Sequence, residues 1–459
     1  MPAVTSQAPL IEALTHYQTH HRRRFHMPGH MGRFIPPALN DLLSLNYDLT
    51  ELDGLDVLSE PTGCIVEAQA QMAQAIGAAH TFFLVNGSSV GIQAAMLTAL
   101  KPGDKVLLPR NVHRSVLSGL ILTGANPVWF LPEWLPGWGL WGQVAPEEVT
   151  RQLDQHPDIK ALILTSPTYE GIGSDIPTIA AICRARNVLL IIDEAHGSLW
   201  PYTDRLPQSA CTTLADAVIQ SIHKTAGSLT QSAAAHLPKG SRMDPHQYQQ
   251  ALNTLQTTSP SYLLLASLDA ARTYLTSPEG QYRLDTVLDE VTRLRETFFT
   301  LNTPFQLFHP SQADHSYWDP TKLFLRLPGA SGEDWGTNLE QTAQLAFESV
   351  SPYGTLYQCG IGLEADDIDF FLNAFSAANH LPSLTPKIPE SNWLTPIVKM
   401  TPRDAFFTEK TTVNKQAATN LISAETVVHC PPGIPVLMPG EQIQPEHIEY
   451  LPETLTVVN

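Results

Sequence analysis

The sequence lacks several features that would place it in a common class of protein. Its 459 residues contain five cysteines, all scattered singly, and no CxxC pair. It has no apolar run long enough to span a bilayer, and the N-terminal segment MPAVTSQAPLIEALTHYQTHHRRRF lacks the apolar stretch of a secretory signal. Isolated cysteines form neither a disulfide framework nor a zinc site. We therefore expect a cytoplasmic protein without membrane contact or bound metal.

Positive charge is also scarce. The chain has 27 lysines and arginines against 45 aspartates and glutamates, which gives a net charge of −18. This charge repels phosphate backbones and argues against nucleic acid as a partner. It is compatible with a cationic small-molecule substrate, and equally with a role in solubility alone. A hydrophobic content of 43% indicates a globular protein, and the length predicts two or three domains.

From residue 61 onward, short apolar runs alternate with helical segments. The runs expected to be strands are 81–85, 105–109, 127–131, 160–165, 188–192 and 217–220. Continuously apolar, β-branched runs separated by helices are typical of a parallel sheet that is buried on both faces. The pattern predicts the α/β fold class, with a doubly wound, mainly parallel large domain over 61–300.

The remaining segments differ in composition from this domain. Residues 1–60 are expected to form an N-terminal helix, at 8–20, followed by an irregular arm. Residues 301–381 suggest a smaller α+β domain, and the proline-rich start of 382–459 indicates a linker before a C-terminal appendix.

The loop after the strand at 81–85 has the composition of an anion site. Gly87 permits close approach of the backbone, and Ser88 and Ser89 add hydroxyl donors to the free N–H groups of a helix N-terminus. These features suit a phosphate group. A serine at this position can also be a simple helix N-cap.

Two further strands end in residues that suit a pyridine ring. Asp193 closes the run VLLIID, and a buried carboxylate is costly unless it is paired, for example with a protonated ring nitrogen. It could also cap the next turn, while His196 could lie near the ring or bond the local backbone. His113 follows the strand at 105–109 and could stack on the ring, donate a proton, or be structural.

Lys224 follows the last expected strand, in the sequence Ser221-Ile222-His223-Lys224. A lysine in the protein interior is unfavourable as a free ammonium, and formation of an imine removes that cost. A lone lysine is more commonly a solvated surface residue. The succession of phosphate loop, stacking group, ring carboxylate and lysine nevertheless predicts a pyridoxal-phosphate (PLP) site at one edge of the sheet.

The chain also resembles a known family, the ornithine/lysine/arginine decarboxylases, which are fold-type I PLP enzymes. The resemblance is to the shorter bacterial members, which lack an N-terminal wing domain. The matching segments are FHMPGHMG (25–32), ELDGLDVL with EPTG (51–63), FFLVNGSSVG (82–91), RNVHRSV (110–116), SPTYEG (166–171), IIDEAHG (191–197), QSIHKT (220–225), TTSPSY (257–262), MTPRDAFF (400–407) and PPGIPVLMPGE (431–441).

The resemblance implies roles for individual residues. Lys224 would carry the cofactor as a Schiff base, Asp193 would pair with the ring nitrogen, and His113 would stack on the ring. The phosphate would be held by Ser88, Ser89, Ser221 and His223, with Thr258 reaching it from a neighbouring subunit of a homodimer or higher homo-oligomer. His196 replaces a tryptophan of the larger relatives.

The expected activity is decarboxylation of a basic amino acid, in which Lys224 or His223 returns the proton to the α-carbon. Arginine or lysine is favoured, ornithine is possible, and the product amine would enter polyamine metabolism. The candidates for binding the distal cation of the substrate are Asp53, Asp56, Glu364 and Asp366.

Two rival functions share this fold. An aminotransferase or another PLP-dependent lyase would need a cation to bind the α-carboxylate, for which Arg326 and Arg403 are candidates. A non-catalytic PLP-binding regulatory homologue would retain the same loops without turnover.

Overall fold

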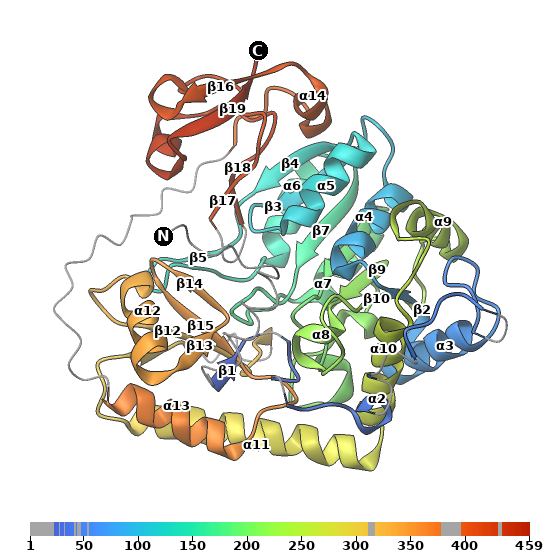
Figure 1. Cartoon of the computed structure of the whole chain (residues 1–459). Helices are drawn as coiled ribbons and strands as arrows, with labels where there is room; N and C mark the ends of the chain where they lie inside the picture. The colour runs from blue at the N-terminus through green and yellow to red at the C-terminus, as the bar shows by residue number, and fades with distance from the viewer. Residues whose placement is uncertain are drawn as a thin grey trace, which may run out of the picture.

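The structure is a computed structural model that describes residues 23–26, 28–31, 33–40, 43, 47–52, 55–310, 317–377, 396–429 and 434–459. These residues form a large α/β domain, a smaller domain beside it and a C-terminal unit (Figure 1). The helix expected at 8–20 lies outside the described residues, as does most of the proline-rich segment 382–397.

A seven-stranded sheet forms the centre of the large domain. Its order is β2 (Ala78–Leu84), β10 (Ala233–Pro238), β9 (Ala217–Gln220), β8 (Leu189–Asp193), β7 (Ile159–Thr165), β3 (Lys105–Pro109) and β4 (Asn126–Phe130). The strands from β9 to β4 are parallel, whereas β10 is antiparallel to both of its neighbours. The mainly parallel sheet is therefore confirmed, and β10 is a strand that the sequence pattern did not predict.

Helices cover both faces of this sheet. One face carries α4 (Gly87–Ala99), α5 (Arg114–Thr123) and α9 (Pro245–Leu255), and the other carries α3 (Cys64–Ile76), α6 (Pro146–Gln155), α7 (Ile176–Ala185) and α10 (Tyr262–Leu275). The strands are buried on both sides because their apolar residues alternate between these two cores. This double covering leaves the ends of the strands as the place where polar side chains can gather.

The smaller domain is built on an antiparallel sheet with an aromatic core. Its order is β11 (Gln306–Leu307), β12 (Lys322–Arg326), β15 (Gly354–Gln358) and β14 (Ser349–Ser351), and the sheet packs against α12 (Gly332–Ala343) and α13 (Ala365–Ala377). The long helix α11 (Pro278–Thr300) contributes residues to the cores of both domains. The N-terminal arm joins the smaller domain as well, because β1 (Arg23–Phe25) pairs with β13 (Leu345–Phe347).

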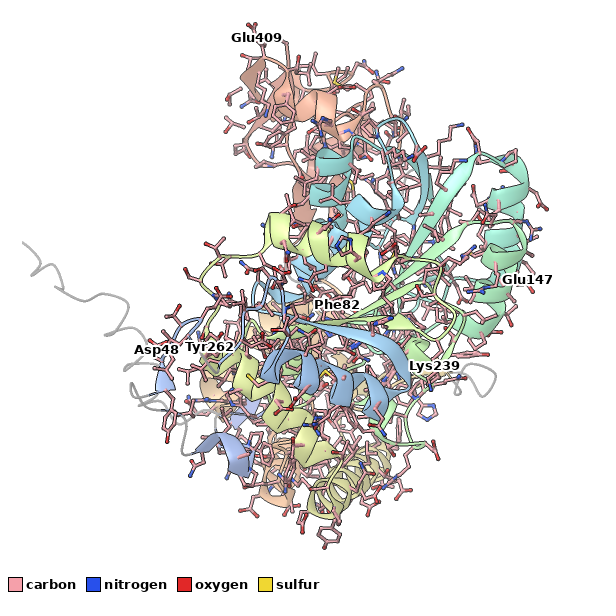
Figure 2. The ribbon with its side chains drawn as sticks, turned by 90° about the vertical axis from the view of Figure 1, so that its right-hand side faces the viewer. Asp48, Phe82, Glu147, Lys239, Tyr262 and Glu409 are labelled. Carbon is pink, nitrogen blue, oxygen red and sulfur yellow. The ribbon has the colours of Figure 1, made fainter. Side chains whose placement is uncertain are left out.

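The C-terminal unit comprises two strand pairs and a short helix. Strand β16 (Lys410–Asn414) pairs with β19 (Thr454–Val458), β17 (Val427–His429) pairs with β18 (Ile434–Leu437), and α14 (Pro402–Phe407) precedes them. Figure 2 shows this unit, marked by Glu409, extending from one end of the large domain. Among the described residues, no helix combines the length and apolar composition needed to cross a membrane.

Candidate active site

A cavity of about 360 Å³ lies where the parallel strands of the large domain end. Nearly all the residues expected from the sequence line it, namely Gly87, Ser88, Ser89, His113, Asp193, His196, Ser221, His223 and Lys224. They meet because the carboxyl ends of parallel strands lie at one edge of a sheet, where ligands of α/β proteins bind.

The Lys224 amine lies within this cavity. Lys224 belongs to the short helix α8 (Ile222–Thr225), which follows β9 directly. Its Nζ lies 2.6 Å from His196 Nε2 and 5.3 Å from the centre of the Tyr169 ring. Burial lowers the pKa of this amine to about 8, although the negative charge of Asp193 acts in the opposite direction. An appreciable fraction of the amine is therefore neutral and nucleophilic near neutral pH.

The backbone around Lys224 is held by two other parts of the chain. Gly29 of the N-terminal arm donates its N–H to His223 O at 2.9 Å, and Gln358 of the smaller domain donates its side-chain amide to Lys224 O at 2.7 Å. A Cβ atom on Gly29 would lie 2.6 Å from the backbone of Thr225, so only glycine permits this approach. The lysine is thus fixed where the arm and both domains meet.

Asp193 and Glu194 are adjacent in sequence but have different surroundings. Asp193 lines the cavity, and its Oδ1 accepts a hydrogen bond from Ala195 N at 3.2 Å. Asp193 therefore caps the following turn, as the alternative interpretation predicted, and it also lines the cavity. Glu194 accepts from Ser209 Oγ, Ala210 N and Gln220 Nε2 at 2.6–2.7 Å. Burial raises the Glu194 pKa to about 7, and its role is structural.

The loop before α4 is suited to an anion. Gly87 has a φ of 75°, in the left-handed region, and neither serine is the N-cap, because that position is Asn86. The first N–H groups of a helix have no intrahelical partner, so those of Ser88 and Ser89 can meet a ligand. Two polar atoms at the cavity, Ser221 Oγ and Asn111 Oδ1, are buried without a hydrogen-bond partner among the described residues. These atoms fit a polar ligand that the chain itself does not supply.

His113 is both the cap of a helix and a lining residue. Its Nδ1 accepts from Ser115 N at 3.2 Å at the start of α5, so the proton of the neutral ring is placed on Nε2. Burial lowers the His113 pKa, and the charge of Asp193 partly offsets this effect. His113 therefore has the structural role of a helix cap and also lines the cavity, while its contact with the cofactor ring stays a prediction.

The other two histidines of the cavity are neutral at physiological pH. His223 Nδ1 lies 2.8 Å from Ser232 O, to which it must donate, and burial lowers the His223 pKa to about 4. Burial also lowers the His196 pKa well below its usual value, and the His196 ring packs on Tyr169 with centroids 4.3 Å apart. These neutral rings favour Lys224 over His223 as the proton donor.

Three residues near the site had no assigned role in the sequence analysis. Tyr169 and Asn111 line the cavity, and the motifs SPTYEG and RNVHRSV contained them. Glu348, between β13 and β14, raises the pKa of the Lys224 amine, so its carboxylate lies within electrostatic reach of that amine. No local pattern marked Glu348, because its position depends on the packing of the two domains.

Most of the acidic candidates for the substrate cation are placed elsewhere. Asp56 accepts from four backbone N–H groups around the start of α3, Glu364 is half exposed beside Arg33, and Asp366 is exposed on α13. None of these three lines the cavity of its own chain. Asp56 is held by backbone groups, Glu364 lies beside Arg33 and Asp366 faces solvent, so a role for them in binding the substrate cation stays a prediction. Asp53 lies outside the described residues.

The remaining candidates also lie away from the cavity. Thr258 is exposed on the loop between α9 and α10, so its contact with a neighbouring subunit stays a prediction. Arg326 donates to Gln306, and Arg403 donates to the carbonyls of Ile121 and Leu122. Among the described residues, no arginine lines the cavity of this chain, so neither Arg326 nor Arg403 is placed there.

Known families and proteins are similar to this chain over nearly its whole length. The model of the Orn/Lys/Arg decarboxylase major domain matches residues 8–312, and that of the C-terminal domain matches 384–458. Arginine decarboxylase of Halalkalibacterium halodurans is 35% identical, over 97% of this chain and 93% of that protein. Arginine decarboxylase of Bacillus subtilis is 34% identical with the same coverage.

Solved structures support the fold. The crystal structure of lysine decarboxylase from Francisella novicida has a TM-score of 0.78 and 17% identity, over 98% of this chain and 83% of that one. The structure of the constitutive lysine decarboxylase of Escherichia coli has a TM-score of 0.75 and 19% identity, over 98% and 82%. The family models and the full-length relatives show that this chain belongs to the Orn/Lys/Arg decarboxylase family.

Proposed function

We propose that the chain decarboxylates arginine to agmatine, with PLP attached to Lys224. Its family membership makes it a decarboxylase of a basic amino acid. Arginine is supported by the full-length relatives at 34–35% identity, whereas the constitutive lysine decarboxylase of Escherichia coli is 24% identical. The observation that carries the proposal is the Lys224 amine, which lies in a cavity with Asp193 and has a lowered pKa.

PLP fits the residues that line the cavity. Asp193 would hold the ring nitrogen, His113 would lie against the ring, and the phosphate would meet Ser221 Oγ and the N–H groups at the start of α4. When bound, the cofactor supplies an electron-accepting ring for the electron pair that remains when the substrate carboxylate leaves as carbon dioxide.

The residues of the chain supply orientation and the proton. The amine of Lys224, in its neutral form, would hold the cofactor covalently. The bond that breaks joins Cα to the carboxylate, and the bond that forms joins Cα to a proton, so each turnover consumes one proton. Lys224 Nζ in its protonated form, which prevails below its pKa of about 8, is the suited donor, because His223 has a pKa of about 4 and is neutral. His196 Nε2, at 2.6 Å, holds the Lys224 amine in place.

The proposal extends to a cytoplasmic homodimer. Thr258 and its neighbours Thr257 and Ser259 are exposed, which supports a role for this loop at a second subunit. Sedimentation of the full chain would show the dimer.

A competition assay tests the proposed substrate. The purified protein, supplied with PLP, is incubated with equal concentrations of arginine, lysine and ornithine, and the products are identified by mass spectrometry. We expect agmatine to form in excess over cadaverine and putrescine. Predominant cadaverine or putrescine would refute arginine as the substrate. A keto acid without carbon dioxide would indicate an aminotransferase, and bound cofactor without any product would indicate a non-catalytic homologue.

Glu348 is the acidic residue that we propose for the distal cation of the substrate. Glu348 does not line the cavity itself, but it is half-buried, it comes from the smaller domain, and its charge acts on the Lys224 amine. An extended arginine whose α-amine takes the place of the Lys224 amine would direct its guanidinium toward a carboxylate in this region. A charge-assisted hydrogen bond of this kind stabilises a complex by about 1.5–3 kcal/mol.

Glu348→Gln should therefore raise the KM for arginine about tenfold to a hundredfold, with a smaller change in kcat. Steady-state kinetics measure both constants. Glu364→Gln is the matched control, because Glu364 is an exposed acid of the same domain and should leave KM unchanged. A normal KM in Glu348→Gln would exclude Glu348 from substrate binding.

A further inference from the structure

We propose that the C-terminal unit, residues 396–429 and 434–459, positions His113 by holding both ends of α5. None of the described residues of this unit lines the cavity of its own chain, so within one chain the unit would act on the reaction through the residues that it holds. In Figure 1 the unit lies over the end of the large domain, with α14 beside α5 and β18 near β3 and β4. The inference rests on the proposed function, in which His113 contacts the cofactor.

A buried ion pair joins the unit to the loop before α5. Arg110 Nη1 lies 2.6 Å from Glu441 Oε1, and Arg110 Nη2 lies 2.8 Å from Glu441 Oε2. Both side chains are 3% exposed. This two-point geometry fixes the orientation as well as the distance of the two groups. The loop and the unit are therefore joined at a defined position.

Further hydrogen bonds complete this contact. Arg110 Nη2 also donates to Val436 O at 2.9 Å, and its guanidinium lies 5.1 Å from the centre of the Trp129 ring. Glu441 Oε2 also accepts from Met438 N at 2.9 Å. Buried charges are tolerated only with such complete partners, so removal of either charge leaves the other unpaired.

A second contact holds the other end of α5. Arg403 of α14 donates through Nη1 to Ile121 O at 3.1 Å and to Leu122 O at 2.8 Å. The last carbonyls of a helix lack intrahelical partners, and the helix dipole favours a cation there. The motif MTPRDAFF thus supplies a cationic cap to the helix that His113 begins.

His113 lies between these two contacts. It is the N-cap of α5, and only Asn111 and Val112 separate it from Arg110. Asn111 and His113 both line the cavity, whereas Arg110 points to Glu441. A shift of the loop at Arg110 would therefore move the imidazole relative to the bound ring. Displacement of a positioned group by about 1 Å can lower a rate about a hundredfold.

The test compares three variants of the full chain. Glu441→Gln removes one charge from the buried pair with little change in shape, and Arg403→Met removes the exposed cap at the other end of α5. Glu453→Gln is the matched control, because Glu453 forms an exposed ion pair with Lys415 inside the same unit, away from α5. The readouts are hydrogen exchange of the amides of residues 112–116 in the cofactor-free protein, together with kcat and KM.

We expect Glu441→Gln to accelerate exchange at 112–116 about tenfold and to lower kcat about tenfold, with KM for the amino acid within about twofold. Arg403→Met should also accelerate exchange and lower kcat, but to a smaller extent. If Glu441→Gln does not fold, the result for Arg403→Met alone tests the inference. Glu453→Gln should match the wild type.

Two results would overturn the inference. The first is that Arg403→Met and a folded Glu441→Gln both keep the exchange rates and the kcat of the wild type. The second is that Glu453→Gln changes exchange and kcat as much as Glu441→Gln does. The exchange measurement uses neither cofactor nor substrate. A failure of the proposed function would therefore appear as an inactive wild type, while the exchange result would still decide whether the unit holds the loop.

Discussion

Lys224→Ala is expected to lower amine formation by a factor on the order of 10⁴. The variant removes both the covalent attachment of the cofactor and the proposed proton donor for Cα, each of which contributes strongly to the rate. Carbon dioxide release from arginine measures the activity. The absorbance of lysine-bound PLP near the visible edge should disappear in the same sample. Lys239→Ala, which changes an exposed lysine at the end of β10, should leave both unchanged (Figure 2). Undiminished decarboxylation in Lys224→Ala would refute the proposed function.

The burial of the Lys224 amine can also be tested without turnover, through the pH dependence of the free energy of unfolding. Its pKa is lowered from 10.5 to about 8 by burial, so between these values the unfolded chain holds a proton that the folded protein has released. Raising the pH through this window therefore favours the folded state. The cofactor-free wild type should gain roughly 2 kcal/mol relative to Lys224→Ala, once solvent screening is allowed for. Parallel urea titrations at pH 7.5 and 10.5 measure this difference.

The residues of the cavity could be predicted because each follows an apolar strand. A polar residue directly after a buried parallel strand must lie at the ligand-binding edge of the sheet. Asp193 and Lys224 were identified in this way, and both line the cavity. The same reasoning could not separate Asp193 from Glu194, since their difference lies in the three donors that meet Glu194.

The parts that could not be predicted depend on distant contacts. Strand β10 has the sequence AAAHLP, whose alanines have low strand propensity, and its place is set by pairing with β2 and β9. The charge of Glu348 acts on the Lys224 amine only because the smaller domain packs against the large one. Asp56 looked equally suited to bind a cation, but its oxygens bond the backbone at the start of α3.

Asp193→Asn is expected to lower kcat about a hundredfold to a thousandfold. An amide cannot balance a positive charge on the ring nitrogen, so the ring would lose its proton and accept electrons less readily. Asp193 is 4% exposed and lines the cavity, and the substitution preserves its shape. Steady-state kinetics with arginine measure kcat, and spectroscopic titration with PLP measures cofactor affinity, which should also weaken.

Glu194→Gln is the matched comparison for Asp193→Asn, because the two carboxylates are adjacent, buried and changed in the same way. Glu194 accepts hydrogen bonds from Ser209, Ala210 and Gln220. In Glu194→Gln the NH₂ group of the amide would face some of these donors and could not accept from them, which should destabilise the fold by about 1–3 kcal/mol. We expect kcat of Glu194→Gln to stay within about threefold of the wild type. If Asp193→Asn instead lost stability and kept its kcat, the carboxylate at 193 would be structural, and the orientation proposed for the cofactor ring would be wrong.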